Sequence, residues 1–306
     1  MYDQISSNKA KSVLLVVFFV VLVLAVGWAF GYMTDLGPGG LLIALGIAFF
    51  MTWGSYWYSD RIVLGMSRAR PASKKSEPYI VNTVEGLAIA AGLPVPRAYI
   101  IEDPAPNAFA TGRNPEHAAI AVTRGLLEKM NRLELEGVIA HEMAHIKNYD
   151  TLVQTLAAVM AGTVVLLADW LLRAMWWGGG GRRGRGRDGG GVSGVLAIAA
   201  LLLMVLAPIF AAVIQMAISR KREYLADANG ALLTRYPQGL ADALRKIASD
   251  PSPLRVANKA TESMYIYNPL KDYRGGRGLN SLFETHPPIQ ERIGRLEAMA
   301  SPGGGA

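Results

Sequence analysis

The sequence predicts a mainly α-helical, multi-pass membrane protein with a polar domain that contains a small β-sheet. Two observations predict the membrane part: 51% of the 306 residues are hydrophobic, and long stretches of the chain have few charged residues or none. A third observation predicts the polar domain, because the two remaining segments combine short strand-like runs with helical patterns.

Four apolar blocks are each about as long as the roughly 20 residues that a helix needs to cross a bilayer. Tryptophans lie toward the block ends, as they do at membrane interfaces. The first block has the position of a signal peptide, but its apolar run is longer than a signal core and no clear cleavage site follows, so we expect a retained anchor. The blocks are residues 13–30, 41–58, 151–177 and 192–219.

Lysine and arginine positions predict the orientation of the first two blocks. Lys9 and Lys11 precede the first block, and five basic residues lie between positions 61 and 75. Basic residues collect on the cytoplasmic side, so we expect the amino terminus and the segment after residue 58 in the cytoplasm. The same bias explains the net charge of +7. Nucleic-acid binding is not expected, because no basic patch is interleaved with stacking aromatics.

The second pair of blocks leaves two topologies open. Residues 178–191, a Gly/Arg-rich loop, hold four arginines that favour the cytoplasm, and residues 220–222 after the fourth block favour the same side. Either the loop is translocated despite its charge or the pair forms a shallow hairpin. We favour full crossing, in which Asp169 and Arg173 pair one helical turn apart.

The two polar segments, residues 60–150 and 220–306, form the expected catalytic domain between and after the hairpins, which are residues 1–59 and 151–219. A helix is predicted over 79–91, and strands over 98–101 and 118–122. Asn131 and Glu134 have the spacing of a capping pair and predict the start of a further helix.

That helix carries a His-Glu-x-x-His motif. His141 and His145 lie four residues apart, so both imidazoles face one side and can hold a zinc ion. Glu142 is rotated by about 100° and can act as a general base on a water that the metal activates. The chain has four histidines and no cysteine, so thiolate zinc sites and disulfides are excluded. His117 lies outside every motif and is expected to be structural.

A catalytic zinc ion normally takes a third protein ligand. Position 151, where an extended motif would place a third histidine, is threonine. Glu223 and Asp227 share one helix face just after the fourth block, so one could bind zinc while the other orients an imidazole. If the third and fourth blocks form a hairpin, Glu223 lies on the same side of the membrane as the two histidines. This placement favours Glu223 as the third ligand. The competing candidates are Glu262, Glu284 and His286.

The chain resembles the HtpX-type membrane metalloproteases, which are relatives of the CAAX prenyl proteases. The resemblance covers most of the chain and rests on four motifs: NAFATG (107–112), HEMAH (141–145), REYLAD (222–227) and THPP (285–288). It implies a zincin-like (gluzincin) metalloprotease domain with one Zn²⁺ per chain. The implied zinc ligands are His141, His145 and Glu223, and the implied base is Glu142. The long Gly/Arg loop is not part of the family pattern.

Three further roles follow from this resemblance. Asn107 matches a residue that contacts the substrate backbone, and His286 matches a histidine that stabilises the oxyanion. Arg292 could then reach Asp227 behind the zinc site.

The resemblance also implies a multi-pass protein of the cell (inner) membrane, with its active site in the cytoplasm, that degrades damaged or misfolded membrane proteins. The expected partners are protein substrates and the lipid bilayer, and the sequence carries no signal for an oligomeric state. One alternative is a narrow-specificity CAAX-type processing protease, which four apolar blocks disfavour because such proteases build a chamber from more spans. The other is a catalytically silent membrane scaffold, which the intact Glu142 disfavours.

Overall fold

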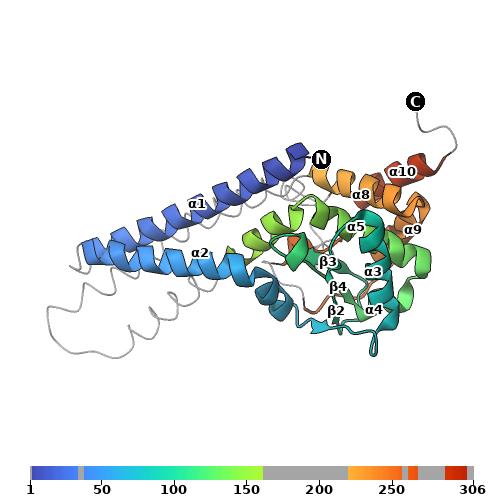
Figure 1. The fold of residues 1–306 in the computed structure, drawn as a ribbon, viewed down its shortest axis with the longest axis horizontal. Coiled ribbons are helices and arrows are strands. Elements are labelled where there is room, and N and C mark those ends of the chain that lie inside the picture. The colour runs from blue at the N-terminus through green and yellow to red at the C-terminus, as the bar shows by residue number, and fades with distance from the viewer. Residues whose placement is uncertain (1, 34–37, 161–219, 257–260, 268–286, 302–306) are drawn as a thin grey trace.

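A computed structural model describes residues 2–33, 38–160, 220–256, 261–267 and 287–301 of the chain (Figure 1). Helices dominate these residues, and a small sheet lies at one end of the molecule. The expected mainly helical fold with a small sheet is thus confirmed. Residues 169 and 173, the loop at 178–191 and the fourth apolar block lie outside the described residues.

The first two helices form an antiparallel pair that extends away from the rest of the chain (Figure 1). They are α1 (Tyr2–Met33) and α2 (Pro38–Met66). Their outward side chains are apolar and exposed, with Val13 62% and Phe50 69% accessible. Among the described residues, one helical stretch, Ile5–Ala25, has the length and hydropathy of a membrane span. Exposed apolar surface of this kind favours a lipid environment.

The sheet has four strands in the order β1-β2-β4-β3. These strands are β1 (Arg70–Pro71), β2 (Arg97–Ile101), β3 (Ala108–Thr111) and β4 (Ala119–Thr123). β2 and β4 run parallel, whereas the two outer strands pair antiparallel with their neighbours. β3 is therefore an edge strand, and Figure 1 places it close to helix α5.

The remaining helical segments of the described residues pack against the sheet or against one another (Figure 1). They are α3 (Pro78–Ala91), α4 (Arg124–Lys129), α5 (Arg132–Lys147), residues 150–160, α8 (Arg220–Thr234), α9 (Pro237–Ser249) and α10 (Ile289–Ala300). Two short 3₁₀ turns, Pro115–His117 and Glu262–Met264, complete the described elements. The main core packs α3, α5, α9 and α10 against one face of the sheet, through side chains such as Ile100, Val138 and Leu244.

Local sequence signals located several of these elements. The expected helix at 79–91 is α3, which ends at Gly92 in the left-handed conformation. The expected strands at 98–101 and 118–122 are β2, which starts one residue earlier, and β4, which is shifted by one residue. The expected capping pair is a capping box, in which Asn131 and Glu134 each accept the other's backbone N–H. The division into two hairpins and a split catalytic domain stays a prediction.

Candidate active site

Helix α5 carries the His-Glu-x-x-His motif at the centre of the polar domain. Its carboxy-terminal half is buried on all sides, because α3, α8, α9 and β3 pack around it. His141, Glu142 and His145 are at most 4% accessible. A polar group in such a place costs free energy unless it is paired or holds an ion.

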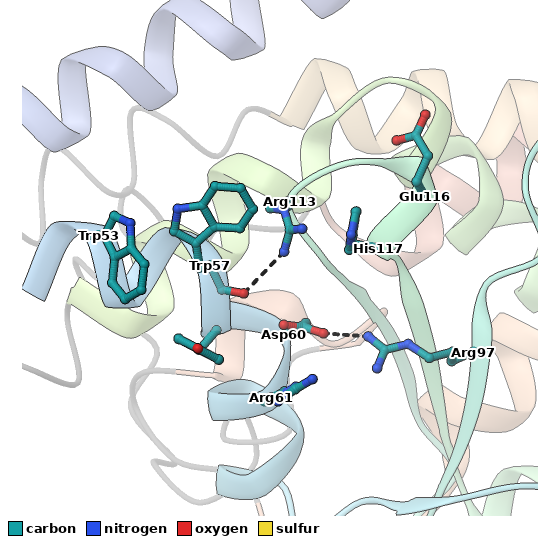
Figure 2. Close-up of a pocket in the computed structure, with 9 residues that line it drawn as sticks. Trp53, Trp57, Asp60, Arg61, Arg97, Arg113, Glu116 and His117 are labelled. Carbon is teal, nitrogen blue, oxygen red and sulfur yellow. Dashed lines mark hydrogen bonds and ion pairs between the residues drawn. The ribbon is translucent and has the colours of Figure 1, made fainter.

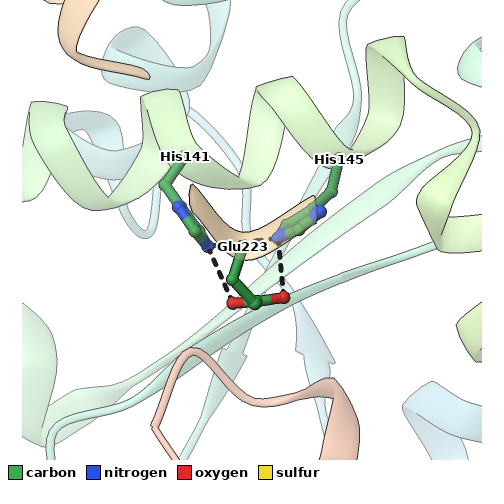
Figure 3. A group of neighbouring side chains, drawn as sticks. All are labelled: His141, His145 and Glu223. Carbon is green, nitrogen blue, oxygen red and sulfur yellow. Dashed lines mark hydrogen bonds and ion pairs between the residues drawn. The ribbon is translucent and has the colours of Figure 1, made fainter. Parts of the chain in front are cut away.

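Glu223 joins the two histidines from helix α8, and Figure 3 shows all three side chains pointing toward one another. The two Nε2 atoms lie 3.1 Å apart. The two Glu223 oxygens lie 3.8 Å from His141 Nε2 and 3.6 Å from His145 Nε2. Two nitrogens bound to zinc at tetrahedral angles lie about 3.3 Å apart, so this donor set fits a zinc ion.

Behind His141, an ion-pair network fixes the ring. Asp227 Oδ1 lies 2.9 Å from His141 Nδ1, one helical turn after Glu223 on the same face of α8. Arg292 of α10 donates to both Asp227 oxygens, at 2.9 and 2.7 Å, and to the carbonyl of Ile266. Burial would raise the pKa of Asp227, but Arg292 outweighs burial and holds that pKa at about 2. Asp227 therefore stays ionised and keeps Nε2 of His141 directed at the metal position.

Behind His145, the corresponding carboxylate is Asp150, whose Oδ2 lies 3.0 Å from His145 Nδ1. Asp150 follows a two-residue turn at the end of α5, where Tyr149 has a φ of +60°. This turn brings the carboxylate back to the histidine. Sequence reasoning missed Asp150, because on a continuous helix it would point away from His145.

Glu142 lies beside the donor set and contacts the edge strand. The backbone of Ala110 in β3 lies close enough to this carboxylate to lower its pKa slightly. Burial raises the pKa of Glu142 from 4.5 to about 7. A carboxylate with a pKa near neutrality is suited to accepting and returning a proton.

The other predicted site residues have different surroundings. Asn107, immediately before β3, is buried, and its Nδ2 donates to the Tyr267 carbonyl at 3.0 Å. Glu262 opens a 3₁₀ turn and is not among the residues that converge on the metal position. Glu284 and His286 lie outside the described residues.

His117 lies in a separate pocket of about 610 Å³ between the end of α2 and the segment after β3 (Figure 2). Its Nδ1 lies 2.8 Å from Asn114 Oδ1, and its backbone N–H bonds the same oxygen. These contacts close the short 3₁₀ turn, and they agree with the expected structural role. The pocket shares no residue with the donor set around Glu223.

Comparison with known proteins agrees with this geometry. The profile of peptidase family M48 matches residues 74–300. The chain is 46% identical to the "Protease HtpX homolog" of Dictyoglomus thermophilum over 298 residues, which cover 97% of this chain and 94% of the relative. Proteins of the same name from Streptococcus pneumoniae (46% over 303 residues, 98% of this chain and all of the relative) and Thermococcus sibiricus (48% over 288 residues, 94% of each) are similar.

Among solved structures, S. mikatae Ste24p has a TM-score of 0.49 and 18% identity, covering 97% of this chain and 67% of that chain. The profile match and the extent of the full-length identities identify the family. The chain belongs to peptidase family M48, as an HtpX-type protease.

Proposed function

We propose that this protein is a zinc-dependent endopeptidase in which His141, His145 and Glu223 hold the metal ion. One observation carries the proposal: their donor atoms all lie within 4.8 Å of one another, in a buried position beside the motif's glutamate. Each histidine also has a carboxylate on its Nδ1, from Asp227 and Asp150 respectively. Such carboxylate–histidine pairs are typical of metal ligands.

The chain's own residues then divide the chemistry of peptide hydrolysis among them. When bound, zinc supplies Lewis-acid activation of water and of the scissile carbonyl. Glu142 takes a proton from the attacking water and returns it to the leaving amine, a role that fits its buried position beside the three ligands. His286 is proposed to donate a hydrogen bond to the oxyanion. Arg292 acts indirectly, by holding Asp227 against His141.

Substrate binding is proposed along the edge strand β3. The Asn107 carbonyl, just before β3, accepts a hydrogen bond from the Thr123 N–H of β4. Hydrogen-bonded positions alternate along an antiparallel pair, so the backbone groups of Ala108 and Ala110 face the outer edge. The Ala108 carbonyl already accepts the N–H of Ile266, and Asn107 bonds the neighbouring Tyr267. An extended substrate that adds to this edge would therefore meet Ala110 first, beside Glu142. The proposed contact between Asn107 and substrate requires the segment Tyr265–Tyr267 to move aside.

A membrane location explains where the site lies. Glu223 follows the fourth apolar block by four residues, and His145 precedes the third block by six. A site tethered close to the bilayer meets membrane-protein loops at a raised effective concentration. We propose a multi-pass protein of the cell membrane with a cytoplasmic site that degrades damaged or misfolded membrane proteins.

The test is to purify the full chain in detergent, measure bound zinc and assay casein cleavage beside Glu142→Gln. The variant removes the base but no ligand, so we expect it to keep zinc and to lose activity by about 10²–10⁴-fold. A wild type that binds zinc without cleaving protein would support a silent scaffold. Cleavage restricted to a single short sequence would support narrow processing. Unchanged cleavage by Glu142→Gln would refute the mechanism.

A further inference from the structure

Helix α1 contributes a buried asparagine to the surroundings of the metal position. Asn8 is 1% accessible and lies near the amino-terminal end of α1, on the side of the helix that also buries Ser12 and Leu15. Its Nδ2 donates to the Asn148 carbonyl at 2.8 Å and to Asp150 Oδ1 at 2.7 Å. Its Oδ1 accepts from Arg222 Nη1 at 2.9 Å. All the polar atoms of this amide side chain are thus used in contacts with the catalytic domain.

These contacts lead directly to His145. Asp150 Oδ2 lies 3.0 Å from His145 Nδ1. The other oxygen, Oδ1, accepts hydrogen bonds from Asn8 Nδ2 and, at 3.2 Å, from Arg222 Nη1. A carboxylate bonded through both oxygens cannot rotate without breaking one set of bonds. The four residues are at most 5% accessible, so water cannot readily replace a lost donor.

We propose that Asn8 is a positioning residue for the metal site, through which the membrane helix α1 holds Asp150 against His145. The proposal rests on the proposed zinc site. When Asp150 accepts the Nδ1 proton of His145, the Nε2 lone pair is directed at the metal position. Without Asn8, the contact of Asp150 Oδ1 that remains within the described part of the chain is the longer one with Arg222. The Asn148 carbonyl also loses its hydrogen bond to α1.

The proposal gives α1 a second role beside anchoring. Zinc affinity depends on α1 being docked on the catalytic domain, so a chain whose first helix is displaced binds the metal more weakly. Ser12, one turn further along α1, provides a matched comparison. It is also buried, but its hydroxyl bonds back to the Asn8 carbonyl at 2.9 Å within the same helix.

The experiment uses the full-length chain in detergent and measures zinc affinity by competition with a chromogenic chelator. The variants are Asn8→Ala, the near-isosteric Asn8→Asp, Asp150→Ala, the double variant Asn8→Ala/Asp150→Ala, and the control Ser12→Ala. We expect both Asn8 variants to lose about 10- to 100-fold in zinc affinity. Ser12→Ala should stay within about twofold of wild type, because its bond is local. Because Asn8 acts through Asp150, the double variant should bind zinc no more weakly than Asp150→Ala.

Thermal unfolding of the zinc-free proteins separates positioning from folding. A merely structural asparagine would lower the melting temperature of the zinc-free protein and leave the zinc dissociation constant unchanged, and this result would overturn the proposal. Additive losses in the double variant would overturn it too. Asn8→Asp keeps the side-chain shape, so its zinc affinity can be measured even if Asn8→Ala does not fold. A wild type without tight zinc binding would instead refute the proposed function, and the positioning role with it.

Discussion

Gly230 marks a close approach of α8 to α5, and replacing it with alanine should weaken zinc binding. An added methyl carbon would lie 3.0 Å from the backbone nitrogen of His141 and 3.2 Å from its Cα. Non-bonded carbon contacts are normally about 3.5–4.0 Å long, and both helices offer only backbone here, so they must separate by roughly half an ångström. Glu223 lies two helical turns before Gly230 on the same face, and its carboxylate moves with α8. Metal–ligand distances tolerate only about ±0.2 Å.

We expect Gly230→Ala to lose about 10- to 100-fold in zinc affinity, measured by chelator competition on the purified full chain. The control is Gly86→Ala in α3, where the added methyl meets nothing within 4 Å. Alanine is favoured over glycine in a helix by about 1 kcal/mol, so propensity alone predicts that both variants are stabilised. A Gly230→Ala protein that is more stable and binds zinc as tightly as wild type would refute this reasoning.

Three further predictions test the ligands and the charge network. Glu223→Ala should remove most bound zinc, whereas His286→Ala should keep zinc and slow turnover. The zinc content of the two purified variants distinguishes these outcomes. If His286→Ala lost the zinc instead, the proposed ligand set would be wrong. Arg292→Met removes the positive charge that faces the buried Asp227 carboxylate, leaves only its contact with His141, and should cost about 3–5 kcal/mol of stability, measured by chemical unfolding. Hydrogen bonds from arginines lower the pKa of Glu77 from 4.5 to about 2, so its stabilisation is present above pH 4.5 and is lost as the pH falls toward 2. Glu77→Gln should lower stability at pH 7 by about 1 kcal/mol and should reduce the loss of stability between pH 4.5 and pH 2. An unchanged loss of stability over this pH range would count against the role given to Glu77.

The sequence could predict those parts of the site that depend on local rules. The capping box fixes where α5 begins, and the four-residue spacing then puts both histidines on one face. Glu223 needed one assumption about tertiary structure, that two apolar blocks return the chain to the same membrane side. The relation between Asp227 and Arg292 came from the family resemblance, and their bidentate contact has the expected partners.

The surroundings of His145 could not be predicted, because they depend on a break that the sequence does not signal. Five residues along a continuous helix correspond to a rotation of about 140°, which would carry Asp150 away from His145. The chain instead turns at Tyr149, whose positive φ costs about 1–2 kcal/mol in a residue other than glycine. Tertiary contacts hold the turn: Asn8 bonds the Asn148 carbonyl, and the Lys9 ammonium lies 4.9 Å from the Tyr149 ring centroid. Both contacts come from α1, so a rule that considers only neighbouring residues would continue α5 straight into the third apolar block. The Asp150 carboxylate therefore reaches His145 only in the folded chain, where the first helix and the end of α5 meet.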